Sequence, residues 1–402
     1  MANVIKNLIG RFFNLERDIN GNWNYQFVET PSFENSDKYL DISLTNPVLS
    51  TIISLRAKMY SQMEIKHLNS SGEVIEGSPY TKLLNNPNYF QSKEDFFFQQ
   101  MWFLSATGND YVYQIKPFSS SIPVSLYNLI PSEMDFKETN KIKKFITTKQ
   151  DVKAYNEQSI SYLLDGTTHM LKIGNLIPFY DLSNGLKENT FMQSPSRVTS
   201  IIKPLENIEQ NLKSKFVNLE MSQKYIVANK STTDSRILQD TDKKAIERSL
   251  GNKSIFVSSG DIEAKHMISD LKRLYLDEQF ANDALKCLLA FDLNKDVLNY
   301  FGNGSSTFEN QEKGELRYLQ NSIMTTANST MNSFSSQWGL LEKGEKLVAS
   351  YAHLNIMQPV MLDKLNTFKS FQETVAIALA NGTMELAEAK KMTQELKINL
   401  GL

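Results

Sequence analysis

The sequence has 402 residues and a single cysteine, Cys287, within an apolar segment of helical pattern. One cysteine cannot form a disulfide within the chain, so a disulfide-stabilised scaffold is excluded. A lone cysteine in such a segment is far more often a core residue than a nucleophile, and we expect Cys287 to be buried. Synthesis in a reducing cytoplasm is therefore expected.

Long apolar runs and blocks of one charge are also missing. No stretch reaches the roughly 18 apolar residues that a membrane-spanning helix needs, so none is predicted. The opening segment, MANVIKNLIGRFFNLE, is interrupted by Lys6 and Arg11, and a signal peptide is not expected. Lys and Arg total 43 against 45 Asp and Glu, a net charge of −2. This balance argues against tight nucleic-acid binding, but it does not exclude a channel through which DNA slides.

Catalytic and cofactor motifs are absent as well. The sequence has no GxxxxGK[ST] phosphate loop, no GxSxG nucleophile elbow and no HExxH zinc motif. Gly302 and Gly304 come nearest to a glycine-rich phosphate loop, but no third glycine or lysine follows at the required place. The four histidines are far apart, and pairs such as Glu385 and Glu388 are typical of a solvated helix end. We therefore predict no metal, no cofactor and no enzymatic activity.

Helices and short strands alternate in the N-terminal half, which predicts an α+β fold. Asn46-Pro47 opens a helix, with Asn as the cap and Pro at the first helical position. Its expected apolar face comprises Val48, Ile52, Leu55 and Met59. Ser92 and Asp95 predict the capped start of a further helix, which ends at Gly108-Asn109. Strands are predicted at MEIKHL, DYVYQI, VSLYNLI, KKFITT and HMLKI.

A long helix is predicted over about residues 196–222, after Ser194-Pro195-Ser196. Apolar residues recur there every three or four positions, which is the spacing of one helix face. That apolar stripe consists of Ile201, Leu205, Ile208, Leu212, Phe216 and Leu219. Pro204 interrupts the pattern, so the first two turns are expected to be either kinked or a separate short piece.

Two more long helices follow. The second begins near Asp270, and between it and the first lies a small α/β insert that includes the strand KYIVAN. A polar loop, FGNGSSTFENQ at residues 301–311, precedes the third helix. The apolar stripe of the third helix comprises Leu319, Ile323, Ala327, Met331, Phe334 and Trp338. Around Asn381-Gly382 the tail predicts two short helices, with Thr383 capping the second.

This order of elements resembles the portal proteins of long-tailed, lambdoid-like bacteriophages. The most specific segment is SPYTKLLNNPNYFQSKEDFFFQQMWFLSATGNDYVYQI. There the family has a short helix ending in Leu-Leu and Pro-Asn, and then a helix that ends in Gly-Asn and leads into an aromatic strand. The other matching segments are NPVLSTIISLRAKMYSQMEIKHL, VSLYNLIPSEMDF, MQSPSRVTSII, FGNGSSTFENQEKGELRYL and LANGTMELAEAKKM. Each segment is weak alone, but all occur in the family's order. The family's usual Val-Pro-Pro is replaced here by LAFDLNKDVLNYFG.

The resemblance implies a portal fold with six parts. These are an N-terminal wing (1–196), a first stem helix (197–223), a small α/β clip (224–268), a second stem helix (269–293), a tunnel loop with the long wing helix (294–350) and a helical C-terminal crown (351–402). It implies a dodecameric ring at one capsid vertex of the virion, made from chains synthesised in the host cytoplasm. The implied partners are further copies of the chain, double-stranded DNA, the large terminase, the major capsid protein and a head–tail adaptor.

Candidate site residues follow from the implied parts. The residues assigned to the channel-lining tunnel loop are Gly302, Asn303, Gly304, Ser305, Ser306, Thr307, Phe308 and Asn310. Glycine and serine let a loop bend as DNA passes, and the absence of Lys and Arg gives it no strong grip on phosphate. Phe308 fits an anchor that packs back on the next helix at least as well as a DNA contact.

The first stem helix supplies the remaining candidates. Its lysines that could face the channel are Lys203, Lys213, Lys215 and Lys224, although a solvated helix face has the same pattern. The apolar stripe is expected to pack against a neighbouring subunit, against the chain's own second stem helix, or against both.

Two other functions fit the sequence. One is a different virion protein built as a helical interaction module, such as an adaptor or a minor capsid component. The other is a hydrolase whose catalytic residues are not close together in the sequence. A closed ring with a central channel would separate the portal from both.

Overall fold

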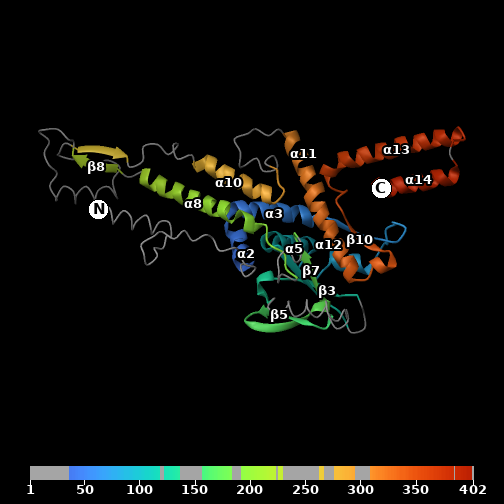
Figure 1. Cartoon of the computed structure of the whole chain (residues 1–402), viewed down its shortest axis with the longest axis horizontal. Helices are drawn as coiled ribbons and strands as arrows, with labels where there is room; N and C mark the ends of the chain where they lie inside the picture. The colour runs from blue at the N-terminus through green and yellow to red at the C-terminus, as the bar shows by residue number, and fades with distance from the viewer. Residues whose placement is uncertain are drawn as a thin grey trace, which may run out of the picture. The chain divides into compact units, whose positions relative to one another are not determined.

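The computed structural model describes residues 36–117, 122–135, 156–182, 192–222, 225–229, 262–266, 276–294, 308–383 and 385–400 (Figure 1). The chain divides into two compact units. Unit 1 comprises residues 1–199 and 315–402, and unit 2 comprises residues 200–314. Helices and strands are mixed, as the α+β prediction requires. Among the described residues, no helix is both long and apolar enough to cross a membrane.

The described part of unit 1 begins with two helices, α2 (Ser36–Thr45) and α3 (Pro47–Ser61). The side-chain oxygen of Asn46 accepts hydrogen bonds from the backbone N–H groups of Val48 and Leu49. These bonds satisfy amide groups that have no partner within the helix, and they confirm the predicted cap.

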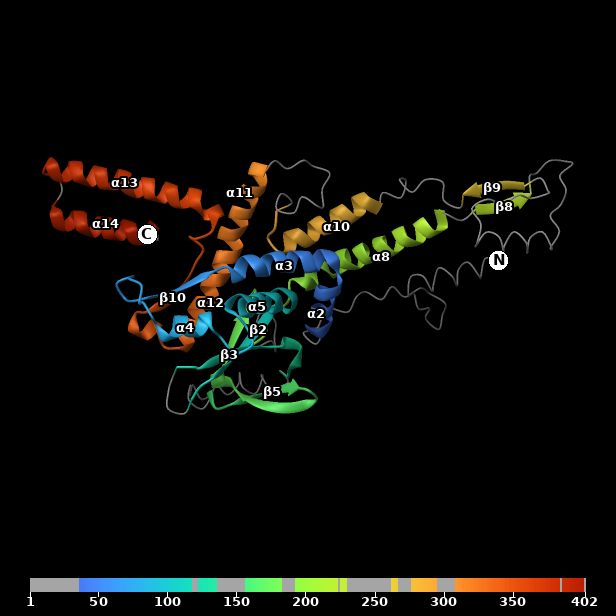
Figure 2. The same ribbon diagram turned by 180° about the vertical axis from the view of Figure 1, so that it is seen from behind.

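The buried face of α3 differs from the predicted one, because Leu55 and Met59 are only partly buried. The buried residues are Val48, Leu49, Ile52, Ile53, Arg56, Ala57, Tyr60 and Ser61. The face is wide because α3 packs against several partners, α2, the long helix α5 (Lys93–Thr107) and a turn at Leu319–Ile323. Figure 2 shows α3 lying beside α5. A helix with several neighbours buries more than one row of side chains.

The helices α4 (Pro79–Asn85) and α5 follow strand β1 (Glu64–Leu68). The predicted boundaries of α5 are confirmed, and α4 is the short helix that the family resemblance implies. Ser92 and Asp95 form a capping box at the start of α5. Gly108 ends α5 in the left-handed conformation, with φ of 81°.

The described strands of unit 1 form three small antiparallel sheets. The first pairs β1 (Glu64–Leu68) with β10 (Lys346–Ser350). The second has the strand order β3 (Ser125–Leu129), β2 (Asn109–Ile115) and β7 (Leu176–Tyr180). The third has the strand order β4 (Met134–Asp135), β5 (Ser159–Leu164) and β6 (Thr167–Lys172). The predicted strands at MEIKHL, DYVYQI, VSLYNLI and HMLKI are confirmed, whereas KKFITT lies outside the described residues. One apolar cluster includes residues from both three-stranded sheets: Tyr111, Leu129, Met134, Ile160, Tyr162, Ile173, Leu176 and Met192.

A long helical rod consists of α11 (Phe308–Tyr318), a π turn at Leu319–Ile323 and α12 (Met324–Gln337). All six residues of the predicted apolar stripe are buried, so that stripe is confirmed. The stripe repeats mostly every four residues, which drifts away from a period of about 3.6. A π turn contains more residues per turn than an α-helix and so helps to keep the stripe on one side. Phe334 and Trp338 end the stripe in an aromatic cluster. There Trp338 stacks on Tyr80, with the ring centres 5.2 Å apart.

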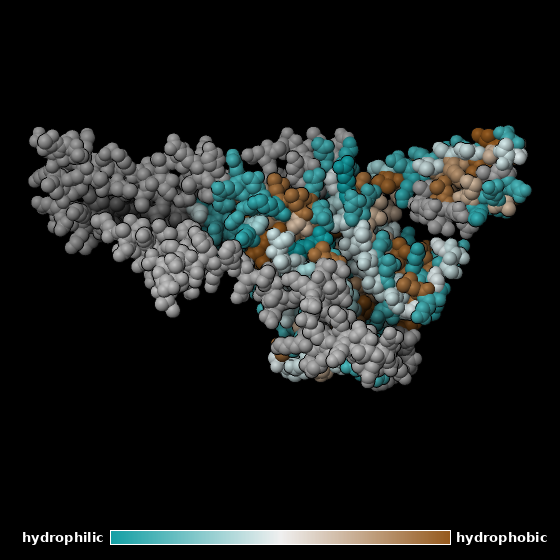
Figure 3. Space-filling model, in the orientation of Figure 1, coloured by the Kyte–Doolittle hydropathy of each residue, from teal (hydrophilic) through white to brown (hydrophobic). Residues whose placement is uncertain are grey.

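The C-terminal helices α13 (Gln358–Ala380) and α14 (Leu386–Leu400) confirm the predicted pair. The expectation of two short helices was wrong for α13, which has 23 residues because it begins far upstream of Asn381-Gly382. Thr383 does not cap α14; its hydroxyl donates to the Ala378 carbonyl at 3.0 Å and closes α13 instead. Apolar side chains remain exposed on this hairpin, including Leu362, Leu365 and Ile377 (Figure 3).

In unit 2 the long helix α8 (Val198–Ser222) continues from its first residues in unit 1. Pro204 lies inside α8, so the alternative of a separate short piece was wrong. The predicted strand KYIVAN is confirmed as β8 (Tyr225–Asn229), which pairs with β9 (Ile262–His266). The described part of the second long helix is α10 (Leu276–Ala290), which ends before the expected residue 293.

Cys287 lies in α10 and is buried, as expected for a core residue. Burial raises the pKa of its thiol to about 12, because a thiolate loses solvation in an apolar environment. The thiol therefore stays protonated near pH 7 and is a poor nucleophile.

A chain of buried polar groups crosses the core of unit 1. The Tyr60 hydroxyl lies 2.8 Å from Thr330 Oγ1 and 3.0 Å from Gln100 Oε1, and Gln100 Nε2 donates to Asp110 Oδ2 at 3.2 Å. Asp110 is fully buried. Loss of solvation raises the pKa of its carboxyl group well above the usual value, and the hydrogen bond from Gln100 opposes this only in part.

Replacement of Asp110 by Asn is expected to flatten the pH dependence of stability. Because the pKa of Asp110 is higher in the folded state than in the unfolded state, its carboxyl group contributes to stability in a pH-dependent way. This contribution is fully present below the unfolded pKa of about 3.9 and is lost as the pH rises through the folded pKa. Asp110→Asn removes this loss, so its free energy of unfolding at pH 8 should match or exceed that of the wild type. Urea unfolding at pH 5 and pH 8 measures the effect, with Asp41→Asn on exposed α2 as the control. An unchanged pH dependence, together with lower stability at pH 8, would contradict the prediction.

Candidate functional site on the long helix

The apolar stripe of α8 is buried at its beginning and exposed farther along. Ile201, Leu205 and Ile208 are at most 3% exposed, whereas Leu212 is 40% and Phe216 71% exposed. Leu219 also lies in α8, but its side chain is outside the described structure. The structure thus covers three of the six residues of the predicted packing face and leaves Leu212 and Phe216 open in a single chain.

The lysines of α8 differ in their surroundings. Lys203 and Lys213 are exposed, and the Lys213 ammonium lies 4.0 Å from the Glu209 carboxylate, a solvated pair of little energetic weight. The Lys215 ammonium lies 5.8 Å from the centre of the Phe280 ring of α10, in a cation–π contact. Lys203 and Lys213 therefore remain the lysines most open to a ligand, whereas Lys215 helps to join α8 to α10. Lys224 lies outside the described residues.

The predicted tunnel loop lies mostly outside the described residues, from Gly302 through Thr307. Phe308 and Asn310 are in the first turn of α11, and Asn310 is exposed. The expected end of the loop at residue 311 was therefore too late.

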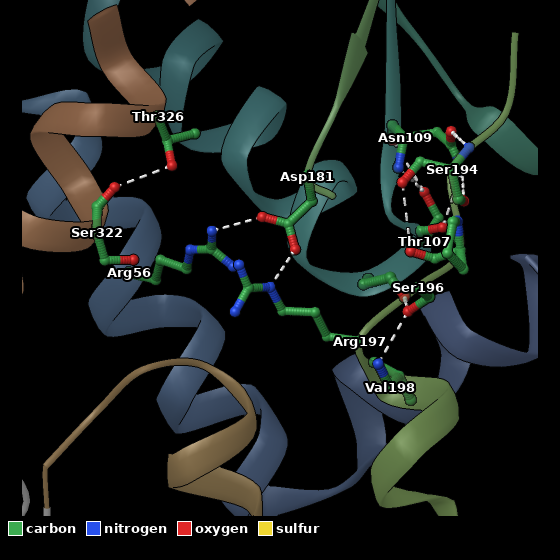
Figure 4. A network of polar contacts seen from close by, with 12 residues as sticks. Arg56, Thr107, Asn109, Asp181, Ser194, Ser196, Arg197, Val198, Ser322 and Thr326 are labelled. Atoms are coloured by element: carbon green, nitrogen blue, oxygen red, sulfur yellow. Dashed lines mark hydrogen bonds and ion pairs between the residues drawn. The ribbon is translucent and has the colours of Figure 1, made fainter. Parts of the chain in front are cut away.

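The start of α8 is fixed to the turn between α5 and β2 (Figure 4). Asn109 Oδ1 accepts from the Ser194 N–H at 2.6 Å, and Asn109 Nδ2 donates to the Ser194 carbonyl at 2.9 Å. The Ser196 hydroxyl donates to the Ala106 carbonyl at 2.7 Å and accepts from the Val198 N–H at 3.0 Å. Ser196 therefore caps α8 and at the same time attaches it to the end of α5.

Gly108 allows this close approach of the two backbone segments. A Cβ atom at this position would lie 2.6 Å from the carbonyl oxygen of Pro195, closer than any ordinary contact. The positive φ of Gly108 is also a conformation that other residues adopt only at a cost. Both the backbone conformation and the available space thus require glycine here.

A buried carboxylate lies between two arginines beside this turn (Figure 4). Asp181 Oδ1 accepts from Arg56 Nη2 at 2.6 Å, and Asp181 Oδ2 accepts from Arg197 Nε at 2.5 Å. The side chains of Arg56 and Asp181 are each 1% exposed, and that of Arg197 is 17% exposed. The Asp181 N–H also donates to the Gly108 carbonyl at 3.0 Å. We call Asp181, its two arginines, Gly108, Asn109, Ser194 and Ser196 the helix anchor.

The helix anchor is sensitive to the loss of any single charge. Burial of an ion pair is not by itself strongly stabilising, but removing one partner leaves an uncompensated charge and costs about 3–5 kcal/mol. Arg56 comes from α3, Asp181 follows β7, and Arg197 immediately precedes α8. The three charges therefore join α3, the end of β7 and the residue before α8, all of which belong to unit 1.

Sequence reasoning identifies only part of the helix anchor. Gly108-Asn109 is recognisable as a helix end and Ser194-Pro195-Ser196 as a helix start, but no local pattern predicts their mutual contact. Arg56 interrupts an otherwise apolar helix face, which is the one available signal of a buried charge. Among the described residues, no group of three or more His, Cys, Asp and Glu side chains could hold a metal ion.

Comparison with known proteins finds similarity in structure alone. No protein-family model and no curated protein sequence matches the chain. A chain in the neck of an empty gene transfer agent particle, computed with C6 symmetry, has 14% sequence identity to this chain and a TM-score of 0.64. The match covers 93% of this chain and 95% of the neck chain. A chain in the neck of the native particle, computed with C12 symmetry, is 12% identical with a TM-score of 0.62, over 92% and 93%.

A crystal structure of an HK97-family phage portal protein from Corynebacterium diphtheriae is also similar. It is 11% identical with a TM-score of 0.50, over 77% of this chain and 93% of that one. Identities this low establish the shared fold and nothing finer. At the level of the fold, the resemblance to phage portal proteins predicted from the sequence is confirmed.

Replacement of Gly108 by Ala tests the close approach at the helix anchor. Gly339 provides a matched control, since it also has positive φ but a Cβ added to it would have no atom within 4 Å. Gly339→Ala should lower the free energy of unfolding by about 1 kcal/mol through backbone strain alone. Gly108→Ala adds a clash with Pro195 and should cost at least about 2–3 kcal/mol. Equal losses in urea unfolding would show that the contact with Pro195 is unimportant.

Proposed function

We propose that this chain, which has the fold of phage portal proteins, is itself a portal protein. It forms a ring at one vertex of the capsid, through which double-stranded DNA enters during packaging and leaves during ejection, and to which the tail is joined. The observation that carries the proposal is the shared fold, which extends over 93% of the chain in the gene transfer agent neck. The helix anchor and the half-covered α8 support it.

Assembly into a ring accounts for the exposed apolar side chains of unit 2. Leu212 and Phe216 on α8 and Leu289 on α10 are exposed in a single chain, Phe216 and Leu289 each at 71%. Covering them with a neighbouring subunit removes apolar surface from water. Head-to-tail contacts that close give cyclic symmetry, and the similar neck chains belong to structures computed with C6 and C12 symmetry. A dodecamer is the state that we propose.

The roles of the parts follow the portal fold. In the proposal residues 1–196 form the wing, α8 and α10 belong to the stem, residues 224–268 form the clip, the loop before α11 lines the tunnel, and α13 and α14 belong to the crown. The clip would bind the large terminase during packaging and the head–tail adaptor afterwards, and the capsid protein would surround the ring. The force for packaging would come from the terminase, because a passive channel needs no catalytic site of its own.

The charge of the stem suits a channel that does not hold DNA tightly. Lys203 and Lys213 are exposed and would offer only two positive charges to a passing phosphate backbone. Each phosphate contact adds affinity that salt weakens, and a dense basic patch would therefore slow sliding. With a net charge of −2 the chain favours weak and transient contacts.

The size of the assembly tests the proposed ring. Mass photometry of the purified protein should show about 551 kDa, the mass of twelve copies of 45.9 kDa, and negative-stain images should show a central channel. The double variant Leu212→Ser with Phe216→Ser should shift the mass towards single chains, whereas Val74→Ser, an exposed apolar position in unit 1, should not. A wild-type protein that stays monomeric or dimeric at micromolar concentration would contradict the portal function and favour another virion protein.

Deletion of Asn303 to Thr307 tests the tunnel-loop assignment. We expect the shortened chain to form rings of normal mass, because the deletion leaves α10 and α11 intact. DNA packaging or retention in particles should fall, as measured by the DNA content of capsids. The length-preserving variant Ser305→Ala with Ser306→Ala is the control and should package normally. Failure of the deletion variant to form rings would mean that the segment is needed for assembly, and the assignment would then be wrong.

A further inference from the structure

Two adjacent aromatic side chains are exposed between α4 and α5. Tyr89 is 97% and Phe90 86% exposed, the highest values among the large exposed hydrophobic residues described. We call this pair the aromatic knob. Single exposed apolar residues are ordinary on a protein surface, but two neighbouring aromatics that contact almost nothing in their own chain are typical of a binding surface.

The aromatic knob is held in place by its neighbours in the chain. Asn88 Oδ1 accepts from the N–H groups of Phe90 and Gln91 at 2.9 Å each, and Asn88 Nδ2 donates to the Leu126 carbonyl at 2.9 Å. The Pro87 carbonyl accepts from the Leu126 N–H at 2.8 Å. The turn is therefore fixed to the beginning of β3, and its backbone loses little conformational entropy when a partner binds.

A second exposed apolar surface of unit 1 lies on the hairpin of β5 and β6. Ile160 and Tyr162 of β5 are buried in the core, so the alternate residues face outward. Leu163 of β5 is 45% and Met170 of β6 63% exposed. Met170 is paired with Ser161 in the ladder, and Ser161 lies two residues before Leu163 on β5. Paired residues share a face of the sheet, and so do residues two apart in a strand, so Leu163 and Met170 lie on the same face. We call Leu163 and Met170 the sheet patch.

The aromatic knob and the sheet patch lie in different parts of unit 1. The turn that carries the knob is hydrogen-bonded to the first residues of β3. The sheet patch belongs to the β4–β5–β6 sheet, and β4 comes after the end of β3 in the chain. A β-strand of this length extends about 16 Å. One chain therefore carries two unlike apolar surfaces, one a small projection and the other a flat face with an adaptable methionine.

We propose that the aromatic knob of one subunit packs on the sheet patch of the next copy of the chain. A head-to-tail contact requires two unlike, complementary surfaces on every subunit, and these two surfaces meet that requirement. A foreign protein bound to the knob would leave the sheet patch uncovered in every subunit. The inference rests on the proposed ring, but it adds a contact within unit 1 that is separate from the stripe of α8.

Removal of the aromatic knob should weaken ring assembly without unfolding the chain. For Tyr89→Ser with Phe90→Ser, we expect half-assembly in mass photometry to need on the order of tenfold more protein than for the wild type. Below the concentration at which rings form, the melting temperature of the single chain should be unchanged, because the knob contacts little of its own chain. Leu341→Ser, exposed at 50% elsewhere in unit 1, is the control and should assemble normally.

Cross-linking tests the pairing of the two surfaces directly. Cys287 is buried and the chain has no other cysteine, so introduced thiols are selectively accessible. In assembled rings of the double variant Phe90→Cys with Met170→Cys, a short bismaleimide should produce a ladder of covalent oligomers. Neither single variant should form such a ladder.

Three outcomes would overturn the inference. They are rings of the double cysteine variant that do not cross-link, dimers formed by Phe90→Cys alone, and a knob variant that assembles normally but fails to enter capsids. The last would assign the knob to another protein. A wild-type chain that forms no ring would instead overturn the proposed function, so the two failures are distinguishable.

Discussion

The ion pairs of Asp181 with Arg56 and Arg197 fix the place where the long helix α8 begins. Asp181 follows β7 directly, and Gly108 lets the Ser-Pro-Ser segment lie directly on the end of α5. The buried carboxylate neutralises charge that would otherwise be unfavourable in the core. In the proposed ring, α8 would have to keep its position while DNA passes, and the helix anchor would give it a rigid start from residues far apart in the sequence.

Exposed apolar surface connects the fold to assembly. A soluble single chain would lose stability and solubility by displaying Phe216, Leu289 and the aromatic knob to water. In the proposed ring the same side chains would become contacts between copies, and each subunit would use two unlike surfaces for its two neighbours. The buried polar chain from Thr330 to Asp110 lies inside unit 1, where its hydrogen bonds favour one arrangement of the core helices.

Local signals predict much of the fold, and long-range contacts escape prediction. The caps at Asn46 and Ser92 and the stripe from Leu319 to Trp338 depend on residues a few positions apart, so the sequence alone is sufficient. The pairing of β1 with β10 joins opposite ends of unit 1 along the chain, a separation that local patterns cannot encode. In the candidate site, the spacing of the stripe and of the lysines of α8 predicts a helix face. Which of these residues are buried and which are exposed depends on tertiary packing, and the sequence pattern does not contain that information.

A cryo-electron microscopy reconstruction of the assembled protein would locate α8 in the assembly and so decide whether the chain is a portal subunit. We expect a closed ring with an axial channel, in which Lys203 and Lys213 of α8 face the channel and Phe216 packs between neighbouring subunits. A closed dimer, or a ring in which α8 lies on the outer surface away from any channel, would contradict it.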